Sequence, residues 1–546
     1  MNQLNWQDVT PSLEQYETLL KSTRTLPKKT FVDLQPRMAA TISRFSKIFG
    51  LTRVLLINCV DNSIYRDFIS DSVKNETSLP VVTTESLDAK LLFDRYSVSE
   101  NGETVFQSGL LSKADNGYLI VPANLILANP GYWPNIKSAV QKHPIDPLNL
   151  SPTRLASSPI SSCRYDVKLV VTGERSQLAE LEYIDEDFRS GFTMYTEVEE
   201  DIHLSQQNLA DYLSLVNWIC SEYCLPSLDD SAFKRLLLAG MRYTEDQHYL
   251  PLGVMWHCQL LSLASQYSSN EELDYDAIDR AIDDKYYRES YLPQRAVYDI
   301  LDGQVIIETT GEQVGQINGL TVVDMSGHPV SYGEPARISC VIHFGDGDVS
   351  DVERKAELGG NLHAKGMMIM QAFLSSALKL DEPLPYSASI VFEQSYSEVD
   401  GDSASLAELC CLVSALSASP VNQQIAVTGA VDQFGRVQAV GGLNEKIEGF
   451  YQVCKHQGFT RNQGVVMPTS NLKHLALHKD VIESIKSGEF HIWSVSTVDE
   501  AIPIIMGKPF RGEDDSIIGK IAERIESFER HEHTEGIVQR IKNWFV

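Results

Sequence analysis

The chain has 546 residues, of which 74 are acidic and 46 basic, and it carries a net charge of −28. A chain of this length forms about three to four domains of ordinary size. Its 43% of hydrophobic residues is typical of folded globular proteins. An acidic surface repels phosphate backbones and anionic lipid headgroups, so the charge argues against nucleic-acid and membrane partners.

Residues 1–10 contain neither the basic nor the apolar stretch of a secretory signal, and no run of about 18 apolar residues predicts a membrane-spanning helix. The nine cysteines are scattered and odd in number, as is typical of a reducing compartment. Cys220, Cys224, His257 and Cys258 are metal-ligating types, but their spacing favours buried thiols on helices over a zinc site. We therefore predict a cytoplasmic protein without a metal cofactor.

The first third of the chain, residues 1–204, alternates apolar runs with helix-compatible polar segments. The runs predict buried strands at 53–60, 118–122 and 167–172, and this alternation indicates an α/β module. The Pro- and Ser-rich segment 143–162 is predicted as a surface loop.

Residues 205–299 show apolar residues at helical spacing, which predicts a helical subdomain and linker, with a solvated helix in the acidic segment 271–284. A second α/β region is predicted over 300–510, followed by a peripheral, amphipathic helical tail over 511–546. The strands of the second region are expected at 305–307, 320–323, 338–343, 389–392, 425–428 and 464–467.

An α/β module followed by helices is typical of nucleotide-hydrolysing proteins, which bind phosphate with a GxxxxGK[ST] loop. That loop is missing: the Gly-Lys pairs at 507–508 and 519–520 are not followed by Ser or Thr. The strand predicted at 118–122 is followed by Ala123 and Asn124 rather than by an acidic pair. We therefore expect no ATP hydrolysis and no cofactor.

The segment 399–405 (VDGDSAS) follows a predicted strand and precedes an apolar helical stripe. Ser403 is thus expected at a helix N-terminus, where free backbone N–H groups can stabilise an oxyanion. Gly401 and Ala404 leave room for a substrate. Two interpretations remain open, since Ser403 is either a nucleophile or, like Ser405, a cap of the helix.

The segment 440–446 (VGGLNEK) places Lys446 in the first turn of another predicted helix. The positive end of the helix dipole and burial both lower the pKa of a lysine, which makes Lys446 a candidate general base. An exposed surface lysine is the alternative. Between the two segments a strand ends at Thr428, whose hydroxyl can hold a lysine amine in place.

Together these segments resemble the Lon proteases (endopeptidase La). The proteolytic domain of Lon has a serine in a DGxSA motif, a lysine in a GGLxEK motif and a Thr-Gly strand end between them, here at 400–404, 441–446 and 428–429. The aspartate after the glycine, at 402, and the serine after the alanine, at 405, are similar to the LonB type. Residues 311–320, 333–340 and 353–374 resemble the bacterial YcbZ-type Lon-like proteins, whose ATPase module is degenerate.

The resemblance implies a multidomain α/β protein: a degenerate AAA+-like α/β module with a helical subdomain, followed by a Lon-type α/β proteolytic domain. The family uses ATP and Mg²⁺, but this dependence does not transfer to a chain without the phosphate-binding loop. Residues 108–110 with 116–119 resemble the degenerate Walker-B region of LonB-like chains, and residues 187–189 resemble their arginine-finger region.

The resemblance also implies a serine endopeptidase with a Ser–Lys dyad that degrades unfolded or flexible proteins. Ser403 is expected to attack the peptide carbonyl, Lys446 to take its proton and Thr428 to orient the lysine. Asp400 is expected to shape the loop and to pair with Lys446 in a resting state. Lon-like proteins form closed rings, so a homo-hexamer is expected.

Two other functions compete with this interpretation. The first is a non-catalytic Lon-like scaffold or chaperone-like binding protein, because the chain already lacks one activity of the family. The second is an α/β-hydrolase, but the GxSxG-like segment 401–405 lacks its final glycine. Of the remaining candidates, His363 and Lys365 are predicted to pack in the core or at a subunit boundary, residues 393–395 to line the cleft, and residues 531–533 (HEH) to form a solvated tail rather than a metal site.

Overall fold

The computed structural model describes residues 2–100, 102–151, 153–154, 158–268, 272–345, 349–378, 386–394, 401–512 and 515–534. The chain forms two compact units. The first comprises Ser22–Ser227 and Leu252–Gln259, and the second Met1–Lys21, Leu228–Pro251 and Leu260–Val546. Across the described part of the chain, none of the helices combines the length and the apolar character that a membrane crossing requires.

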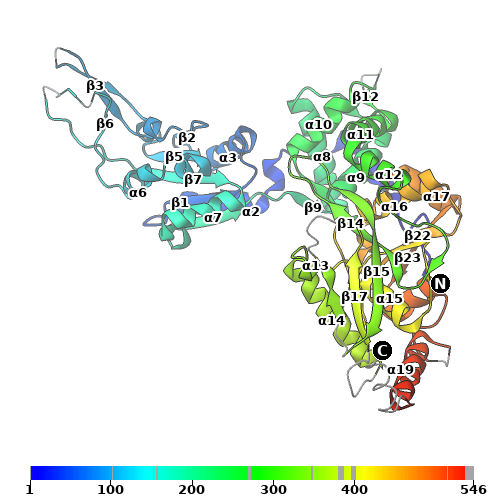
Figure 1. The fold of residues 1–546 in the computed structure, drawn as a ribbon. Coiled ribbons are helices and arrows are strands. Elements are labelled where there is room, and N and C mark those ends of the chain that lie inside the picture. The colour runs from blue at the N-terminus through cyan, green and yellow to red at the C-terminus, as the bar shows by residue number, and fades with distance from the viewer. Residues whose placement is uncertain are drawn as a thin grey trace. The chain divides into compact units, whose positions relative to one another are not determined.

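The first unit is built on a five-stranded parallel sheet in the order β2-β5-β7-β1-β8 (Figure 1). Its strands are β1 (Val54–Asn58), β2 (Val81–Thr83), β5 (Gly117–Pro122), β7 (Val167–Gly173) and β8 (Thr193–Glu197). The three predicted strands are therefore the three central ones. Central strands of a parallel sheet are covered on both faces and read as continuous apolar runs, whereas the half-exposed edge strands β2 and β8 do not.

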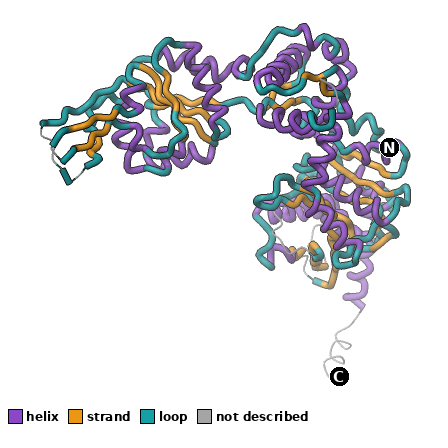
Figure 2. The backbone as a smooth tube through the Cα atoms, turned by 90° about the horizontal axis from the view of Figure 1, so that it is seen from above, coloured by secondary structure: helices purple, strands orange, loops and turns teal. Residues whose placement is uncertain are grey.

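Helices cover this sheet on both faces, as Figure 2 shows for the strands drawn in orange between helices drawn in purple. The longer helices of the unit are α2 (Pro36–Lys47), α3 (Ser63–Glu76), α6 (Trp133–Val140), α7 (Arg175–Ile184) and α8 (Gln206–Glu222). The strands β3 (Arg95–Val98), β4 (Thr104–Gln107) and β6 (Leu148–Asn149) form a separate small sheet. Because β6 lies within residues 143–162, the segment predicted as a loop contains one short strand.

The segment 205–299 is helical, as the periodicity predicts. After α8 it contains α9 (Asp230–Tyr243), α10 (Val254–Ala264) and α11 (Tyr275–Glu289), and α12 (Tyr291–Leu301) follows. The boundary between the compact units falls inside this segment, with α8 in the first unit and α9, α11 and α12 in the second. The acidic helix α11 is not fully solvated, because it buries Ala277, Ile278 and Ala281.

The second unit contains a seven-stranded mixed sheet in the order β16-β17-β15-β14-β19-β22-β23 (Figure 1). Its strands are β14 (Gln316–Val323), β15 (Tyr332–Phe344), β16 (Val349–Asp351), β17 (Tyr386–Phe392), β19 (Ile425–Val427), β22 (Gln463–Pro468) and β23 (Phe490–Val495). Its helices include α13 (Val352–Lys355), α14 (Asn361–Leu378), α15 (Ser405–Ser417), α16 (Leu443–Gln457), α17 (Lys479–Lys486), α18 (Val498–Met506) and α19 (Ile517–Thr534).

Two apolar cores lie on opposite faces of this sheet, because successive side chains of a strand point to opposite faces. In β19, Ile425 and Val427 belong to the core formed with α14, α15, α18 and α19, whereas Ala426 belongs to the core formed with α16 and α17. The helix α15, which follows Ser403, and the helix α16, which carries Lys446, thus pack on different faces of the sheet.

Three segments of the second unit differ from the sequence-based expectation. Residues 305–307 form no strand. Residues 2–4 belong with the C-terminal sheet rather than with the first α/β module, since Leu4 N–H donates to Ile492 O (2.8 Å) along the edge strand β23. The part of the tail that the structure describes is not peripheral, because α19 buries Ile517 and Ile521 against the core that contains α15.

The helix α15 is buried along all thirteen residues, although its sequence predicts an amphipathic stripe. The helix α19 covers a face of α15 within the shared core, and Arg524 of α19 donates to the carbonyls of Ala415 (2.8 Å) and Leu416 (3.0 Å) at the C-terminal end of α15. A helix enclosed on all sides is held rigidly, which fixes the loop that precedes it.

Candidate active site

The loop before α15 carries Ser403. The helix begins at Ser405, so Ser403 lies two residues before its first residue. Gly429, just after β19, donates from its N–H to Ser403 O (2.9 Å) and accepts from Leu406 N–H at its carbonyl (3.0 Å). Gly429 has φ +152°, and a Cβ there would lie 2.9 Å from Val437 Cγ1, so glycine is required for this approach. The loop is therefore pinned to the strand end.

The interpretation of these serines as helix caps is not supported. The capping position is Ala404, which has no side chain able to cap, and the Ser405 hydroxyl accepts instead from Val431 N–H (3.0 Å). Free backbone N–H groups were expected at this helix end to face a substrate, but two of these groups already donate hydrogen bonds within the protein. Ser405 N–H donates to Asp402 O (3.1 Å), and Leu406 N–H is taken by Gly429.

The helix α16 carries Lys446 in its first turn. Gly442 precedes the helix in the left-handed region at φ +61°, where a Cβ would lie 2.5 Å from Val322 Cγ2. Lys446 is only 3% exposed, so it is not a surface lysine.

The backbone of β15 lies directly against this helix. A Cβ at Gly333 would stand 2.0 Å from Glu445 O and 2.6 Å from Lys446 N, and a Cβ at Gly449 would stand 2.1 Å from Gly333 O. Two glycines thus allow strand and helix backbones to touch where the lysine emerges. No local sequence pattern marks Gly333, because the contact joins segments more than a hundred residues apart.

The structure brings Ser403, Lys446 and Thr428 together. Lys446 Nζ lies 2.9 Å from Ser403 Oγ and 3.5 Å from Thr428 Oγ1, and the threonine hydroxyl donates to Ser403 O (3.3 Å). Thr428 is fully buried. A serine hydroxyl within hydrogen-bond distance of a buried amine is the arrangement that an activated nucleophile needs.

Burial lowers the pKa of Lys446 to about 8, because the charged ammonium is poorly solvated at this position. The charge of Asp402 acts in the opposite direction and raises this pKa. Sequence reasoning had named Asp400 as the carboxylate that influences the lysine, and Asp400 lies outside the described residues. Asp402 was missed, although its place directly before Ser403 was the available signal.

Residues 393–395 were predicted to line the cleft. Glu393 accepts a hydrogen bond from Ser339 Oγ (2.7 Å), and the side chain of Gln394 binds the backbone at Ile306 N (2.8 Å) and Gln304 O (2.7 Å). Both residues therefore tether neighbouring chain segments, and Ser395 lies outside the described residues.

His363, which is 1% exposed, packs in the core of the second unit. Its Nε2 lies 3.1 Å from Asp351 Oδ2 and its Nδ1 lies 3.7 Å from Glu408 Oε1. Burial opposes protonation of His363, but the two carboxylates raise its pKa overall, while burial raises the pKa of Glu408 to about 7. This cluster joins α14 to β16 and to α15. Lys365 of the same helix is exposed.

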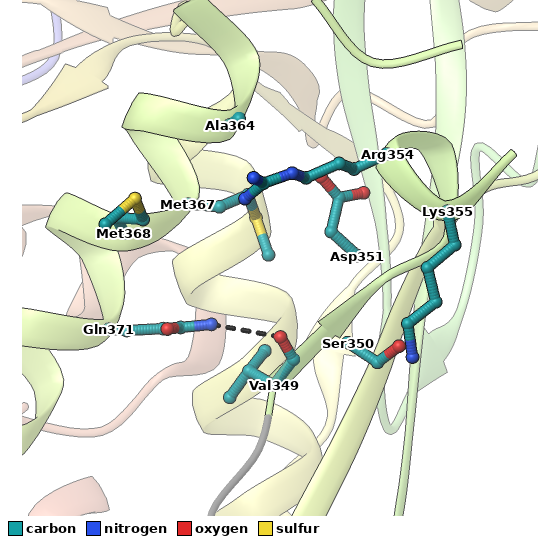
Figure 3. Close-up of a pocket in the computed structure, with 9 residues that line it drawn as sticks. All are labelled: Val349, Ser350, Asp351, Arg354, Lys355, Ala364, Met367, Met368 and Gln371. Carbon is teal, nitrogen blue, oxygen red and sulfur yellow. Dashed lines mark hydrogen bonds between the residues drawn. The ribbon is translucent and has the colours of Figure 1, made fainter. Parts of the chain in front are cut away.

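A cavity of about 430 Å³ lies between β16, α13 and α14 (Figure 3). Figure 3 shows Gln371 donating to Val349 O (3.1 Å) and Arg354 extending over Asp351 toward Met367. Neither Ser403 nor Lys446 lines this cavity. Helix α14 also approaches the loop before Ser403, because a Cβ at Gly366 of this helix would lie 3.1 Å from Asp402 Cβ.

The metal-ligating residue types singled out in the sequence lie in the first compact unit. Cys220 is buried on α8, Cys224 is exposed, and His257 is buried with its Nε2 2.8 Å from Tyr212 Oη. Within the described residues, no group of three or more His, Cys, Asp or Glu side chains is arranged to hold a metal ion. The side chains of residues 531–533 are outside the described part of the chain.

A doubly wound sheet binds its ligand at the carboxyl ends of its strands. In the first unit this place is occupied by Asp61, which follows β1 and accepts hydrogen bonds from Arg66, from Asn124 Nδ2 (2.8 Å) and from Gln177 Nε2 (3.1 Å). Arg66 also binds Glu85. A carboxylate repels phosphate, and the arginine that could attract phosphate is already paired, so these residues do not fit a nucleotide.

Comparison with known proteins finds a family match in two segments of the chain. Residues 78–199 match the family described as the LonB-like AAA domain, and residues 393–508 match the Lon protease (S16) C-terminal proteolytic domain. These matches confirm the fold class expected from the sequence, with an AAA-like α/β module followed by a Lon-type proteolytic domain.

Two of the relatives match over most of the chain, and an archaeal one matches over a shorter part. It is 35% identical to the "Putative Lon protease homolog" of Escherichia coli (strain K12), with 100% of this chain and 99% of that protein covered. A protein of the same name from Haemophilus influenzae is 40% identical over 74% of this chain and 67% of its own length. The archaeal Lon protease of Methanocaldococcus jannaschii is 35% identical over 27% of this chain and 22% of its own length.

Proposed function

This chain belongs to the Lon protease family, and on that premise we propose that it is a serine endopeptidase whose Ser403 and Lys446 form the catalytic dyad. The observation that carries the proposal is the 2.9 Å contact between Ser403 Oγ and Lys446 Nζ at a buried lysine. Burial lowers the pKa of this lysine to about 8, so a substantial fraction of the amine is neutral near physiological pH.

The chemistry is acyl transfer in two steps. The neutral amine of Lys446 accepts the hydroxyl proton while Ser403 Oγ attacks the peptide carbonyl, and the resulting ammonium returns the proton to the departing amine. An acyl-enzyme remains. Water then attacks this ester with Lys446 again as base, which releases the second product and restores Ser403. Thr428 orients the amine through the 3.5 Å contact. The negative charge of Asp402 stabilises the ammonium form of Lys446.

A fluorophosphonate probe tests the dyad directly, because it reacts covalently with an activated serine. We expect labelling of Ser403, located by mass spectrometry of the digested protein, together with hydrolysis of unfolded casein. The alternative function is a non-catalytic scaffold or chaperone-like binding protein. That alternative requires an unreactive Ser403, so binding of unfolded casein without labelling and without cleavage would favour it.

Hydrolysis is expected to proceed without ATP. The missing phosphate-binding loop and the paired Asp61 and Arg66 at the strand ends both argue against a bound nucleotide. The measurement compares casein turnover with and without ATP and Mg²⁺, alongside calorimetric titration of the nucleotide. Saturable binding together with ATP-stimulated turnover would contradict this expectation.

The substrates we propose are unfolded or flexible proteins, processed in the cytoplasm, with neither nucleic acid nor membrane as a partner.

A freely accessible dyad would cleave any flexible loop, so we propose that the sites are enclosed in a homo-oligomeric ring, most simply a hexamer. A ring contact needs two different patches on each subunit. Of the Met-rich segment 366–370, Met368 remains 64% exposed and is available for such a contact. Light scattering should report a particle of about six chains, and a monodisperse monomer at micromolar concentration would refute the ring.

A further inference from the structure

Two carboxylates flank the proposed catalytic lysine along α16, and one arginine holds both. Arg242 of α9 donates from Nη2 to Glu445 Oε1 (2.7 Å), from Nη1 to Glu448 Oε1 (2.7 Å) and from Nη2 to Glu448 Oε2 (3.0 Å). Its side chain is 30% exposed, and those of Glu445 and Glu448 are 17% and 15% exposed. Bidentate pairing of this kind fixes both distance and orientation.

The same arginine also ties the helix to the chain that follows β22. Arg242 Nη1 donates to Ala476 O (2.9 Å), while Glu448 Oε1 accepts from His478 N–H (2.8 Å). Asn444, at the start of α16, donates to His474 O and accepts from Ala476 N–H, both at 2.8 Å. The first two turns of α16 are therefore bound to α9 and to residues 474–478 through polar side chains.

On its other side this part of α16 lies against the backbone of β15. Because a Cβ at Gly333 would stand 2.0 Å from Glu445 O, the helix has no free space in that direction. Lys446 directly follows Glu445, whose side chain binds Arg242 and whose carbonyl meets Gly333. A shift of the first turn therefore moves the amine relative to Ser403, which the buried helix α15 holds in place.

Without Arg242, the helix would keep two poorly exposed carboxylates without their cation. Oε2 of Glu445 has no hydrogen-bond partner among the described residues even with the arginine in place. The two carboxylates would then repel each other and become hydrated. Both effects are expected to displace the turn that carries Lys446. Burial opposes the charge of Arg242, but Glu448 and Glu445 raise its pKa overall, so it stays a cation.

We propose that Arg242 is a positioning residue of the peptidase, which keeps Lys446 Nζ within hydrogen-bond distance of Ser403 Oγ by clamping Glu445 and Glu448. This inference rests on the proposed function. Arg242 lies in the segment 205–299, which the sequence assigns to the helical subdomain of the ATPase-like module. That segment thus contributes a residue to the support of the proposed proteolytic site.

The test compares four proteins as full-length chains: wild type, Arg242→Ala, Arg242→Lys and Arg235→Ala. Arg235 is the matched control, because it lies on the same helix and pairs with Asp279 of α11 (Nε–Oδ1 2.8 Å) rather than with α16. The readouts are kcat and KM on a fluorogenic casein-like substrate, and the midpoint of thermal unfolding.

For Arg242→Ala we expect kcat to fall roughly tenfold to a hundredfold with KM changed less than about threefold, since misplacement of a catalytic group acts on the chemical step. Arg235→Ala should lower the unfolding midpoint comparably and keep most of the wild-type kcat. Arg242→Lys retains the charge and should recover part of the loss.

Wild-type kcat in Arg242→Ala, or an equal loss of kcat in Arg235→Ala, would overturn the inference while leaving the proposed dyad intact. An inactive wild-type protein would overturn both. If Arg242→Ala does not fold, Glu448→Gln decides, because it removes one carboxylate of the clamp and preserves volume. A reduced kcat at unchanged KM supports the clamp, and an unchanged kcat refutes it.

Discussion

Replacement of either Ser403 or Lys446 by alanine is expected to reduce peptide hydrolysis by at least about a thousandfold, since each variant removes one partner of a single proton-transfer unit. Without Ser403 no acyl-enzyme forms. Without Lys446 the hydroxyl, whose Oγ lies 2.9 Å from the amine, has no base to take its proton. The measurement is the initial rate of casein cleavage at equal protein concentration, with circular dichroism to verify folding.

Two control variants separate catalysis from structure. Ser405→Ala removes a neighbouring hydroxyl that accepts from Val431 N–H, which should cost about 1 kcal/mol of unfolding free energy and leave most of the activity. Lys455→Ala removes a lysine of the same helix, paired with Asp480 at 2.9 Å, and should be neutral for turnover. Substantial activity in Ser403→Ala or Lys446→Ala would refute the mechanism.

The rate of hydrolysis is expected to rise with pH and to level off above about pH 8. Lys446 acts as a base only when neutral, and burial lowers its pKa to about 8. Two pH units below that value only about one amine in a hundred is neutral, so kcat/KM at pH 6 should be roughly a hundredfold below its plateau. A full pH profile of kcat/KM between pH 5 and 10 measures this limb.

Asp402→Asn provides a control with a defined direction. The charge of Asp402 raises the pKa of Lys446, so its removal should lower that pKa and move the rising limb to lower pH. Lys455→Ala should leave the limb in place, because that residue lies two turns further along α16. A rate independent of pH between 6 and 9, or a shift of the limb to higher pH in Asp402→Asn, would exclude Lys446 as the base.

Local sequence was enough to place the three residues that meet in the second unit. Ser403, Thr428 and Lys446 each stand where a strand or turn gives way to a helix or loop, and glycines at 429 and 442 mark those junctions. Such junctions are encoded by neighbouring residues, so spacing and turn chemistry suffice to predict them. The distances between the three side chains are set by how α15 and α16 pack on the two faces of the sheet.

Residues that act through distant contacts left no local signal. In the sequence, Arg242 is an ordinary polar residue of a helix, and Gly333 is a glycine that weakens a strand. Their contacts with α16 appear only in the folded structure. Asp61 likewise reads as a loop residue, and only the parallel sheet sets it beside Asn124 and Gln177 at the strand ends. In each case the partner lies more than sixty residues away, beyond the reach of a periodicity argument.

The sequence by itself determined the central strands β1, β5 and β7 and the absence of a phosphate-binding loop, and it singled out Ser403, Thr428 and Lys446 as candidates, because hydrophobic runs and turn residues act locally. The tertiary structure alone decided that residues 2–4 join the edge of the C-terminal sheet, that α19 encloses α15, and that burial brings the pKa of Lys446 down to about 8. Solvation and backbone contact depend on everything packed around a residue, and that surrounding exists only once the chain has folded.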